Sequence, residues 1–277
     1  MTGGQLEGFV IGITADRRWS EQADLLRRRG AEIMHGPSIA TAFLAEDQVL
    51  RAQTEDLIER PPEYLTATTG LGIRAWMEAA DGWGRRAALV AALSQARIVT
   101  RGPKSAAAVQ AAGMTVWRSA ANEQMNEVIA IMAGEALAGV RVAVQRYGTP
   151  APELMATLTA AGAETVEVVV YQWRTPDDTR PCLDLIDAAI AGRLHAVTFT
   201  AAPAATNLFA IAATAGREGR LLEAFNQGGV VAACVGPVCA QGAIGAGVES
   251  PLVPAIGRLG LLVRALSDRL NPPAAAD

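Results

Sequence analysis

The sequence has few of the residues that usually carry metal, redox or nucleic-acid chemistry. Its 277 residues include only three cysteines (Cys182, Cys234 and Cys239), two histidines (His35 and His195) and one lysine. The cysteines have no metal-ligand spacing, so neither a structural zinc site nor a disulfide framework is expected. A net charge of −4 and a pI of about 5.4 argue against nucleic-acid binding by this chain.

Signals for membrane insertion or secretion are also missing. The start of the chain, MTGGQLEGFVIGIT, lacks the basic region of a signal peptide. Two stretches without charged side chains, 195–216 and 224–248, contain Gly, Pro, Asn, Gln or Thr at intervals short enough to interrupt a membrane span. We therefore expect a soluble, cytoplasmic protein. Because 51% of its residues are hydrophobic but only 5% are aromatic, its core should consist mainly of Ala, Val, Leu and Ile.

Signature motifs of several enzyme classes are absent. The chain has no G-x-x-x-x-G-K-[ST], G-x-S-x-G, H-E-x-x-H or C-x-x-C motif. Gly70-Leu71-Gly72 follows a predicted strand but lacks the third glycine of a dinucleotide fingerprint, and no acidic residue is evident near the end of a second strand. A nicotinamide enzyme is therefore disfavoured.

What the chain does contain is an internal repeat. Segments 9–32 and 140–164 each predict an apolar strand, a polar turn and a helix, and each ends in Gly-Ala-Glu. Segments 65–80 and 197–212 also match as strand, small-residue turn and helix. About 30 residues further on, segments 97–114 and 231–248 share a Gly-Pro pair and a later glycine at a constant offset. Proline at a helix start and glycine just after its end are typical of helix termini.

This repeat predicts an α/β fold. Strands that alternate with helices of 10–15 residues favour parallel sheets with helices on both faces, and right-handed crossovers make such sheets doubly wound. The alternative is the general similarity of strand–turn–helix units in any α/β protein. The identical Gly-Ala-Glu and Gly-Pro matches favour a duplication, hence two doubly wound parallel-sheet domains of similar topology.

Four strand-to-helix turns are made of small residues, which indicates an anion site. Such turns expose backbone N–H groups at a helix N-terminus, where carboxylates or phosphates bind; the alternative is that small residues only allow close packing. Arginines and the lysine at or beside corresponding turns would add charge-assisted contacts, or else be solvated. The turns are Thr68-Thr69-Gly70, Gly102-Pro103-Lys104-Ser105, Ala201-Ala202-Pro203 and Gly236-Pro237-Val238-Cys239, and the basic residues are Arg17, Arg101, Lys104 and Arg146.

Tyr171 is the candidate catalytic residue. It ends the apolar run VEVVVYQW, just before the polar segment 174–180. A tyrosine at a strand end near a domain crossing can serve as a proton donor or ligand contact. The alternative is a packing residue with its hydroxyl in solvent.

Together these motifs resemble the uroporphyrinogen-III synthase family from about Phe9 to Leu270. The matches are RRRGAE in the first helix, VVVYQWR at the crossing, VTFTAAPAA where the family commonly has F-[TF]-S-P-S-G, and VGPVCAQGA where it commonly has I-G-P-x-T-A. The resemblance implies an interleaved chain with a two-strand hinge: residues 1–37 plus 174–270 form one domain and 38–173 the other. Residues 271–277 would be a tail or linker.

The resemblance also implies an activity. The family cyclises hydroxymethylbilane, an anionic linear tetrapyrrole with eight carboxylates, to uroporphyrinogen III with inversion of the last (D) ring, and needs no cofactor. The family's tyrosine matches Tyr171. We expect a monomer that binds this substrate between its two domains. The expected substrate-binding residues are Thr69, Gly70, Arg101, Lys104, Ser105, Arg146, Ala201, Ala202, Val238 and Cys239.

An alternative interpretation rests on departures from the family pattern. Ala201 and Pro203 stand where the family commonly has serines, and Cys239 where it has threonine. The segments ATTGLGIRAWMEAADGWG and RGPK resemble a subgroup fused to a C-terminal winged-helix DNA-binding domain. In that subgroup the synthase-like body would act as a ligand sensor in a transcription regulator, and a linker-like end at 271–277 would fit it.

Overall fold

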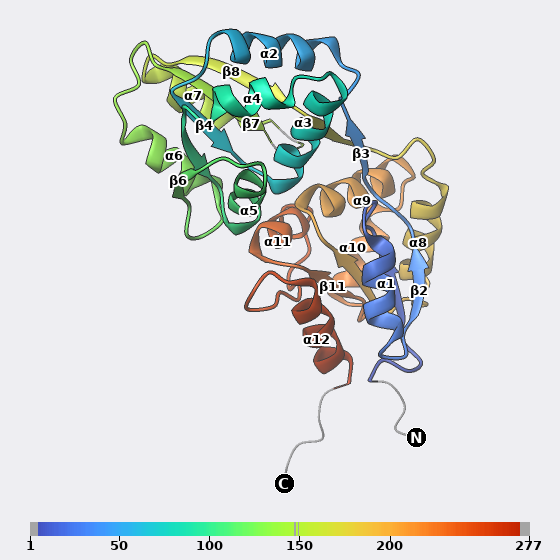
Figure 1. Cartoon of the computed structure of the whole chain (residues 1–277). Coiled ribbons are helices and arrows are strands. Elements are labelled where there is room, and N and C mark those ends of the chain that lie inside the picture. Colours follow the sequence, from blue (N-terminus) through green and yellow to red (C-terminus); the bar gives the residue numbers. More distant parts are fainter. Residues whose placement is uncertain (1–4, 147, 149, 272–277) are drawn as a thin grey trace. The chain divides into compact units, whose positions relative to one another are not determined.

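A computed structural model describes residues 5–146, 148 and 150–271 (Figure 1). The chain divides into two compact units, one made of Met1–Ala40 with Arg174–Asp277 and the other of Thr41–Trp173. The chain therefore leaves the first unit, builds the second and returns. Of the predicted tail at 271–277, only Asn271 lies within the described residues.

The second unit contains a five-stranded parallel sheet in the order β6-β5-β4-β7-β8. Its strands are β4 (Tyr64–Ala67), β5 (Arg97–Thr100), β6 (Val116–Ser119), β7 (Arg141–Arg146) and β8 (Glu164–Val169). Its helices are α2 (Gln48–Glu59), α3 (Gly70–Gly82), α4 (Arg86–Leu93), α5 (Pro103–Ala111), α6 (Met125–Ala133) and α7 (Pro152–Ala160).

Helices cover both faces of this sheet because successive strand residues point to opposite sides. Leu65 and Ala143 join a core with α2, α3, α4 and α5. Their neighbours Tyr64 and Val142 join a second core with α6 and α7. The doubly wound arrangement predicted for this part of the chain is confirmed.

The first unit has a four-stranded parallel sheet in the order β11-β10-β1-β2. Its strands are β1 (Val10–Ile13), β2 (Glu32–His35), β10 (Ala196–Phe199) and β11 (Val231–Cys234). Its helices are α1 (Trp19–Arg27), α8 (Arg180–Ile190), α9 (Ala202–Thr214), α10 (Glu218–Asn226), α11 (Pro237–Gly245) and α12 (Leu259–Leu270).

This sheet is also covered on both faces. Ile11 and Ile13 pack with α1 and α12. Between them, Gly12 faces Leu185 of α8, on the side where α8, α9, α10 and α11 pack together. β1 lies beside β10, with Ile11 opposite Ala196, so the two N-terminal strands β1 and β2 complete a sheet whose other two strands come from the last third of the chain.

The two units have the same topology, apart from one edge strand. Strand order β11-β10-β1-β2 repeats as β5-β4-β7-β8, with an additional β6 at the edge of the second sheet. Gln48 and Arg180, which begin α2 and α8, are 132 positions apart. Met125 and Leu259, which begin α6 and α12, are 134 apart. The duplication therefore extends through helices whose sequences show no obvious match.

Glycines end corresponding helices in both units. The residue after the helix C-cap must often adopt a left-handed conformation, which only glycine adopts without strain. The four glycines predicted for this role all have positive φ values: Gly30 (95°), Gly113 (88°), Gly162 (77°) and Gly247 (99°).

A two-stranded sheet stands at the boundaries between the units. It consists of β3 (Ala40–Phe43) and β9 (Tyr171–Arg174). The sequence predicts one continuous strand ending at Tyr171, but β8 ends at Val169 and Tyr171 begins β9. The carbonyl of Val170 accepts a hydrogen bond from the N–H of Leu44, which draws the chain out of the five-stranded sheet at this point.

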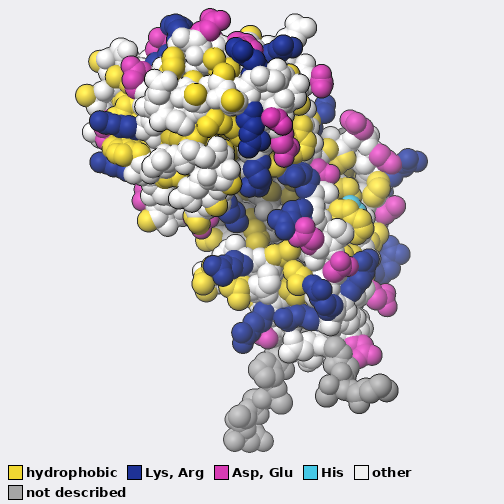
Figure 2. All heavy atoms as spheres, in the orientation of Figure 1, with side chains coloured by type: hydrophobic (Ala, Val, Ile, Leu, Met, Phe, Trp, Pro, Cys, Tyr) yellow, Lys and Arg dark blue, Asp and Glu magenta, His cyan; other side chains and the backbone are white. Residues whose placement is uncertain are grey.

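None of the described helices is long and apolar enough to cross a membrane. On the face drawn in Figure 2, acidic and basic side chains both occur on each unit, so neither unit presents a surface of one sign there.

Candidate functional site

In the second unit, the candidate site begins where β4 meets α3. Thr69 is the N-cap of α3, and its Oγ1 accepts a 3.0 Å hydrogen bond from the N–H of Gly72. The side chain thus satisfies one of the N–H groups that a helix start leaves without an intrahelical partner. The positive end of the α3 dipole lies at this threonine.

Tyr171 contacts this helix start directly. Its hydroxyl donates a 3.3 Å hydrogen bond to Oγ1 of Thr69, and its side chain is 1% exposed. Its ring packs against those of Phe43 and Trp173. Because Thr69 Oγ1 accepts hydrogen bonds from both Gly72 and Tyr171, the proton of its own hydroxyl is directed elsewhere. Tyr171 and Thr69 therefore form a short donor chain: the Tyr171 hydroxyl donates to that of Thr69, and the hydroxyl of Thr69, a half-buried residue, can donate to a further acceptor.

Gln145, at the end of β7, holds the helix start in place. Its Oε1 accepts a hydrogen bond from the N–H of Thr69 at 3.3 Å, and its Nε2 donates to the carbonyl of Arg146 at 2.6 Å. The carbonyl of Gln145 also accepts from the hydroxyl of Thr68 at 2.8 Å. Sequence reasoning missed this residue, although a glutamine in the apolar run VRVAVQR, fully buried in the structure, was a visible signal.

The start of α5 lies against the start of α3. A Cβ at Gly70 would collide with the backbone carbonyl of Lys104, so the two helices approach here only because residue 70 is glycine. Ser105 is buried, and its hydroxyl donates to the carbonyl of Gly102 at 2.9 Å while accepting from the N–H of Gly102 at 3.3 Å. The serine therefore shapes the Gly-Pro turn, while Lys104 stays exposed.

Arg101 follows β5 and Arg146 ends β7, at the same edge of the sheet. The N–H of Arg101 donates to the carbonyl of Ala67 at 3.1 Å. The guanidinium of Arg146 is paired with Glu167 at 3.5 Å, and its side chain is 13% exposed. Its buried Nε has no acceptor among the described residues. Arg146 therefore keeps donor capacity beside Gln145.

The first unit repeats this edge with fewer polar side chains. Ala201 is the N-cap of α9, with φ −147° and ψ 144°, close to the −142° and 142° of Thr69. It provides no side-chain cap. A Cβ at Gly242 of α11 would collide with the carbonyl of Ala202, so α9 and α11 approach as closely as α3 and α5 do.

Val238 and Cys239 form the first turn of α11. Val238 is 50% exposed, whereas Cys239 is 4% exposed. A hydrogen bond between the thiols of Cys239 and Cys234, together with burial, raises the pKa of Cys239 well above its usual range. Cys239 therefore remains a neutral thiol and differs from a threonine at this position in offering only a weak donor.

The structure thus brings Thr69, Gly70, Lys104 and Tyr171 into one group in the second unit, beside Arg146. Ala201 and Ala202 form a corresponding group with α11 in the first unit. That the two groups face one another across a cleft stays a prediction. Among the described residues, no three His, Cys, Asp or Glu side chains are grouped so that they could hold a metal ion.

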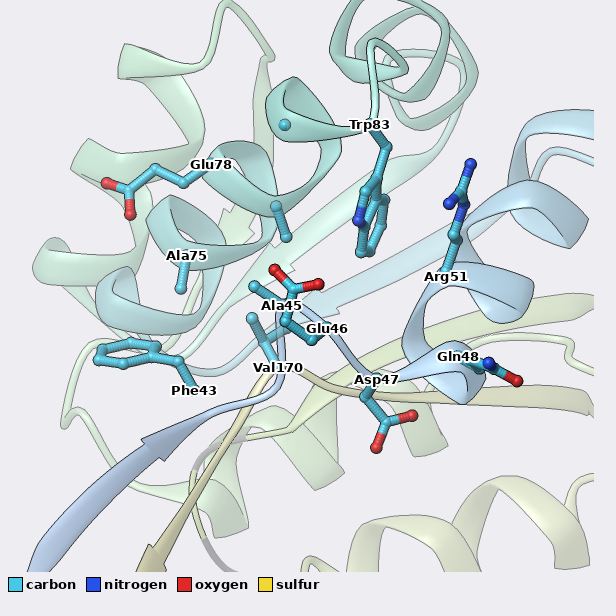
Figure 3. Close-up of a pocket in the computed structure, with 12 residues that line it drawn as sticks. Phe43, Ala45, Glu46, Asp47, Gln48, Arg51, Ala75, Glu78, Trp83 and Val170 are labelled. Carbon is cyan, nitrogen blue, oxygen red and sulfur yellow. The ribbon is translucent and has the colours of Figure 1, made fainter.

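A cavity of about 490 Å³ lies elsewhere in the second unit (Figure 3). It is lined by the second half of α3, the start of α2 and the segment before α2. None of the predicted site residues lines it, but Phe43, whose ring packs against that of Tyr171, and Val170, the residue before Tyr171, both do.

Comparison with known proteins places the chain in a family. A family model described as uroporphyrinogen-III synthase HemD matches residues 20–263. Uroporphyrinogen III synthase from the extremely thermophilic bacterium Thermus thermophilus has a similar structure, with a TM-score of 0.78, 26% identity, and coverage of 96% of this chain and 100% of that one. A synthetase structure from Helicobacter pylori 26695, 14% identical with a TM-score of 0.52, covers 92% of this chain and 97% of that one and supports the fold alone.

Two proteins are similar in sequence. The uncharacterized protein YjjA of Bacillus subtilis (strain 168) is 28% identical over 261 residues, which cover 93% of this chain and 94% of YjjA. A putative uroporphyrinogen-III synthase of Methanothermobacter thermautotrophicus is 34% identical over 107 residues, 39% of this chain and 41% of that protein. Because the family model spans most of the chain and the fold agrees, the chain belongs to the uroporphyrinogen-III synthase family.

Proposed function

We propose that this protein is a uroporphyrinogen-III synthase, a cytoplasmic lyase that converts hydroxymethylbilane to uroporphyrinogen III with inversion of the D ring. The observation that carries the proposal is the donor chain from Tyr171 to Thr69 at the start of α3. The family reaction must remove a hydroxyl group as water, and this step needs a proton at the leaving oxygen.

The substrate's carboxylates would bind at the helix starts. The turns before α3, α5, α9 and α11 all follow parallel strands, and ligands of open α/β sheets bind beyond the carboxyl ends of such strands. Backbone N–H groups there bind anions without a charged side chain. Lys104, Arg101 and Arg146 would add charge-assisted contacts in the second unit.

Thr69 would deliver the proton, with Tyr171 behind it. Tyr171 is 1% exposed, whereas the hydroxyl of Thr69 lies at the half-buried helix start. In the proposed step Thr69 donates its proton to the terminal hydroxyl and receives the proton of Tyr171. The C–O bond breaks and water leaves. Negative charge left on the tyrosine oxygen is stabilised by the nearby N-terminus of α3.

The resulting azafulvene cation would then react within the site. The cation bonds to the substituted α-carbon of the last pyrrole, the C–C bond from that carbon to its methylene bridge breaks, and the released methylene carbon bonds to the free α-carbon of the same ring. Loss of the proton from that carbon restores aromaticity and leaves the ring inverted. The main task of the protein would be to hold both ends of the chain so that this closure is faster than the simple head-to-tail one. The anchored carboxylates provide that positioning.

The test supplies the purified chain with hydroxymethylbilane and separates the product isomers. Type III product above the buffer reaction is expected, whereas only type I product at the buffer rate would refute the proposal. Tyr171→Phe should lower turnover. Tyr64→Phe is the matched control, because the Tyr64 hydroxyl bonds Glu135 at 2.9 Å and Tyr64 begins β4, at the opposite end of that strand.

A second candidate function is ligand binding without catalysis, as the sensing body of a transcription regulator. The observation that favours it is the loss of hydroxyls in the first unit, where Ala201 leaves α9 without a side-chain cap and Cys239 is a buried thiol. Under this hypothesis the chain binds an anionic tetrapyrrole but yields only type I product. Calorimetric titration with a non-cyclising tetrapyrrole analogue, run beside the isomer assay, distinguishes the two candidates.

A further inference from the structure

The cavity of the second unit combines an aromatic wall with an apolar floor. Trp83, just after α3, forms the wall, and small side chains of α3 form much of the floor. Val170 closes the cavity beside the start of β9. Its volume of about 490 Å³ is within the range of small-molecule sites. The lining residues with small or apolar side chains are Phe43, Ala45, Ala75, Ala79, Gly82, Trp83 and Val170.

One carboxylate is directed into this space. Figure 3 shows the carboxylate of Glu46 below the indole of Trp83, whereas those of Asp47 and Glu78 point away from it. Asp47 is already engaged as the N-cap of α2, accepting from the N–H groups of Val49 at 2.7 Å and Leu50 at 3.3 Å. Glu46 has no hydrogen bond or ion pair with any described residue, so its negative charge beside an aromatic face has no internal partner.

We propose that this cavity binds a small organic ammonium ion. The cation would lie between the Glu46 carboxylate and the face of Trp83, where the ring quadrupole attracts positive charge. Its apolar part would cover Ala75, Ala79 and Val170, which a fully hydrated metal ion would not contact.

Arg51 makes it possible to test whether the ligand is positively charged. It lines the cavity from α2, and in Figure 3 its guanidinium lies on the opposite side of the indole from the Glu46 carboxylate. Among the described residues it has no ion-pair partner. A bound cation is therefore repelled by Arg51 and attracted by Glu46, and neutralising these two residues should change the affinity in opposite directions.

The experiment titrates the full chain with benzyltrimethylammonium and choline, and with 3,3-dimethylbutan-1-ol, which has the shape of choline without its charge. Binding is followed by the NMR signal of the Trp83 indole N–H, assigned by its loss in Trp83→Phe. We expect saturable shifts with the ammonium probes and an affinity for the neutral alcohol at least about tenfold below that for choline. The measurement does not depend on the proposed synthase activity.

Three charge-neutralising variants complete the test. Glu46→Gln should weaken choline binding by about five- to tenfold, and Arg51→Gln should strengthen it by about twofold or more. Glu59→Gln, on an exposed position of the same helix α2 outside the cavity, should leave it unchanged. Equal binding of choline and its neutral analogue, no effect of Glu46→Gln, or no saturable shift with either ammonium probe would overturn the proposal.

Discussion

The side-chain amide of Gln145 occupies the space into which a Cβ on Gly72 would project. From that position its oxygen accepts from the N–H of Thr69 at 3.3 Å. The start of α3, and with it the threonine that Tyr171 contacts, is therefore located by a contact that only glycine at position 72 allows. This glycine, which resembles part of a nucleotide fingerprint in the sequence, serves helix packing in the structure.

Gly72→Ala should destabilise the second unit. The added methyl group must displace the buried Gln145 side chain, and such overpacking costs about 1–3 kcal/mol in free energy of unfolding. Gly82→Ala in the same helix is the control. Nothing lies within 4 Å of a Cβ there, so alanine should be neutral or stabilise by up to about 1 kcal/mol. Urea unfolding measures both changes, and an equal effect of the two variants would contradict this account.

Thr69→Ser and Thr69→Val separate the hydroxyl of residue 69 from its methyl group. Valine loses the cap on Gly72 and the acceptor for Tyr171, so we expect a loss of about 1 kcal/mol in stability and a lower kcat in the isomer assay. Serine keeps both hydrogen bonds and should retain most of the turnover. Thr157→Val, which removes an exposed hydroxyl bonded to the Glu153 carbonyl, is the control. Full kcat in Thr69→Val would exclude Thr69 as the proton donor.

Much of the fold could be predicted from the sequence because the duplication left local signals that depend on few residues. The Gly-Pro pairs mark the starts of α5 and α11, and glycines mark helix ends by their left-handed conformation. Such signals survive when packing residues change. The match between α2 and α8, and between α6 and α12, could not be seen because amphipathic helices tolerate almost any set of apolar residues at the right spacing.

The rest of the site depends on tertiary contacts that no local pattern encodes. Gln145 looks like an isolated polar residue until β7 is placed beside β4, which is more than 70 positions earlier in the chain. Likewise the break at Val170 arises from its hydrogen bond with Leu44, because VEVVVYQW by itself predicts one strand. The insertion of β1 beside β10 could be expected only from the family resemblance, since neighbouring repeat units could equally have paired.

Arg146→Gln should raise KM for hydroxymethylbilane more than it lowers kcat. Arg146 ends β7 at the proposed site, and a substrate carboxylate would contact the exposed part of its guanidinium, 13% of the side chain. Arg118→Gln is a matched control, because it also removes one ion pair, the 3.2 Å contact with Glu135. Losing the exposed Arg118 pair costs about 0–1 kcal/mol of stability, whereas the Arg146 side chain is only 13% exposed. A KM unchanged by Arg146→Gln would show that Arg146 has only a structural role.

The three thiols should be unreactive in the folded protein near pH 8. All three cysteines are buried, and burial raises the pKa of Cys182 to about 12. A thiol whose pKa is raised on folding contributes stability below its unfolded pKa near 9 and loses that contribution as the pH rises towards 12. Titration with a disulfide reagent should count three thiols only after denaturation, and Cys182→Ala should flatten the decline of stability between pH 9 and 12. Rapid modification of a native thiol at pH 8 would contradict the burial.

Ala201→Ser tests whether α9 of the first unit can be given the side-chain N-cap that Thr69 provides for α3 in the second unit. The backbone at Ala201 already has the N-cap conformation of Thr69, so a serine hydroxyl would compete for the N–H of Ala204, which now donates to the carbonyl of Ala201 at 3.1 Å. We expect a gain of about 0.5–2 kcal/mol in free energy of unfolding, because an N-cap serine replaces alanine. Ala191→Ser, at the C-cap of α8, should give no such gain.

The same variant distinguishes the two candidate functions. Serine stands at this position in the family's common motif, so in a working synthase Ala201→Ser should keep or raise the yield of type III product while it stabilises the fold. If the chain binds its ligand without catalysis, the variant should become more stable and still give only type I product at the buffer rate. A variant that is less stable than the parent would show that the turn at Ala201 lacks room for a hydroxyl, and the proposed equivalence of the two helix starts would then be wrong.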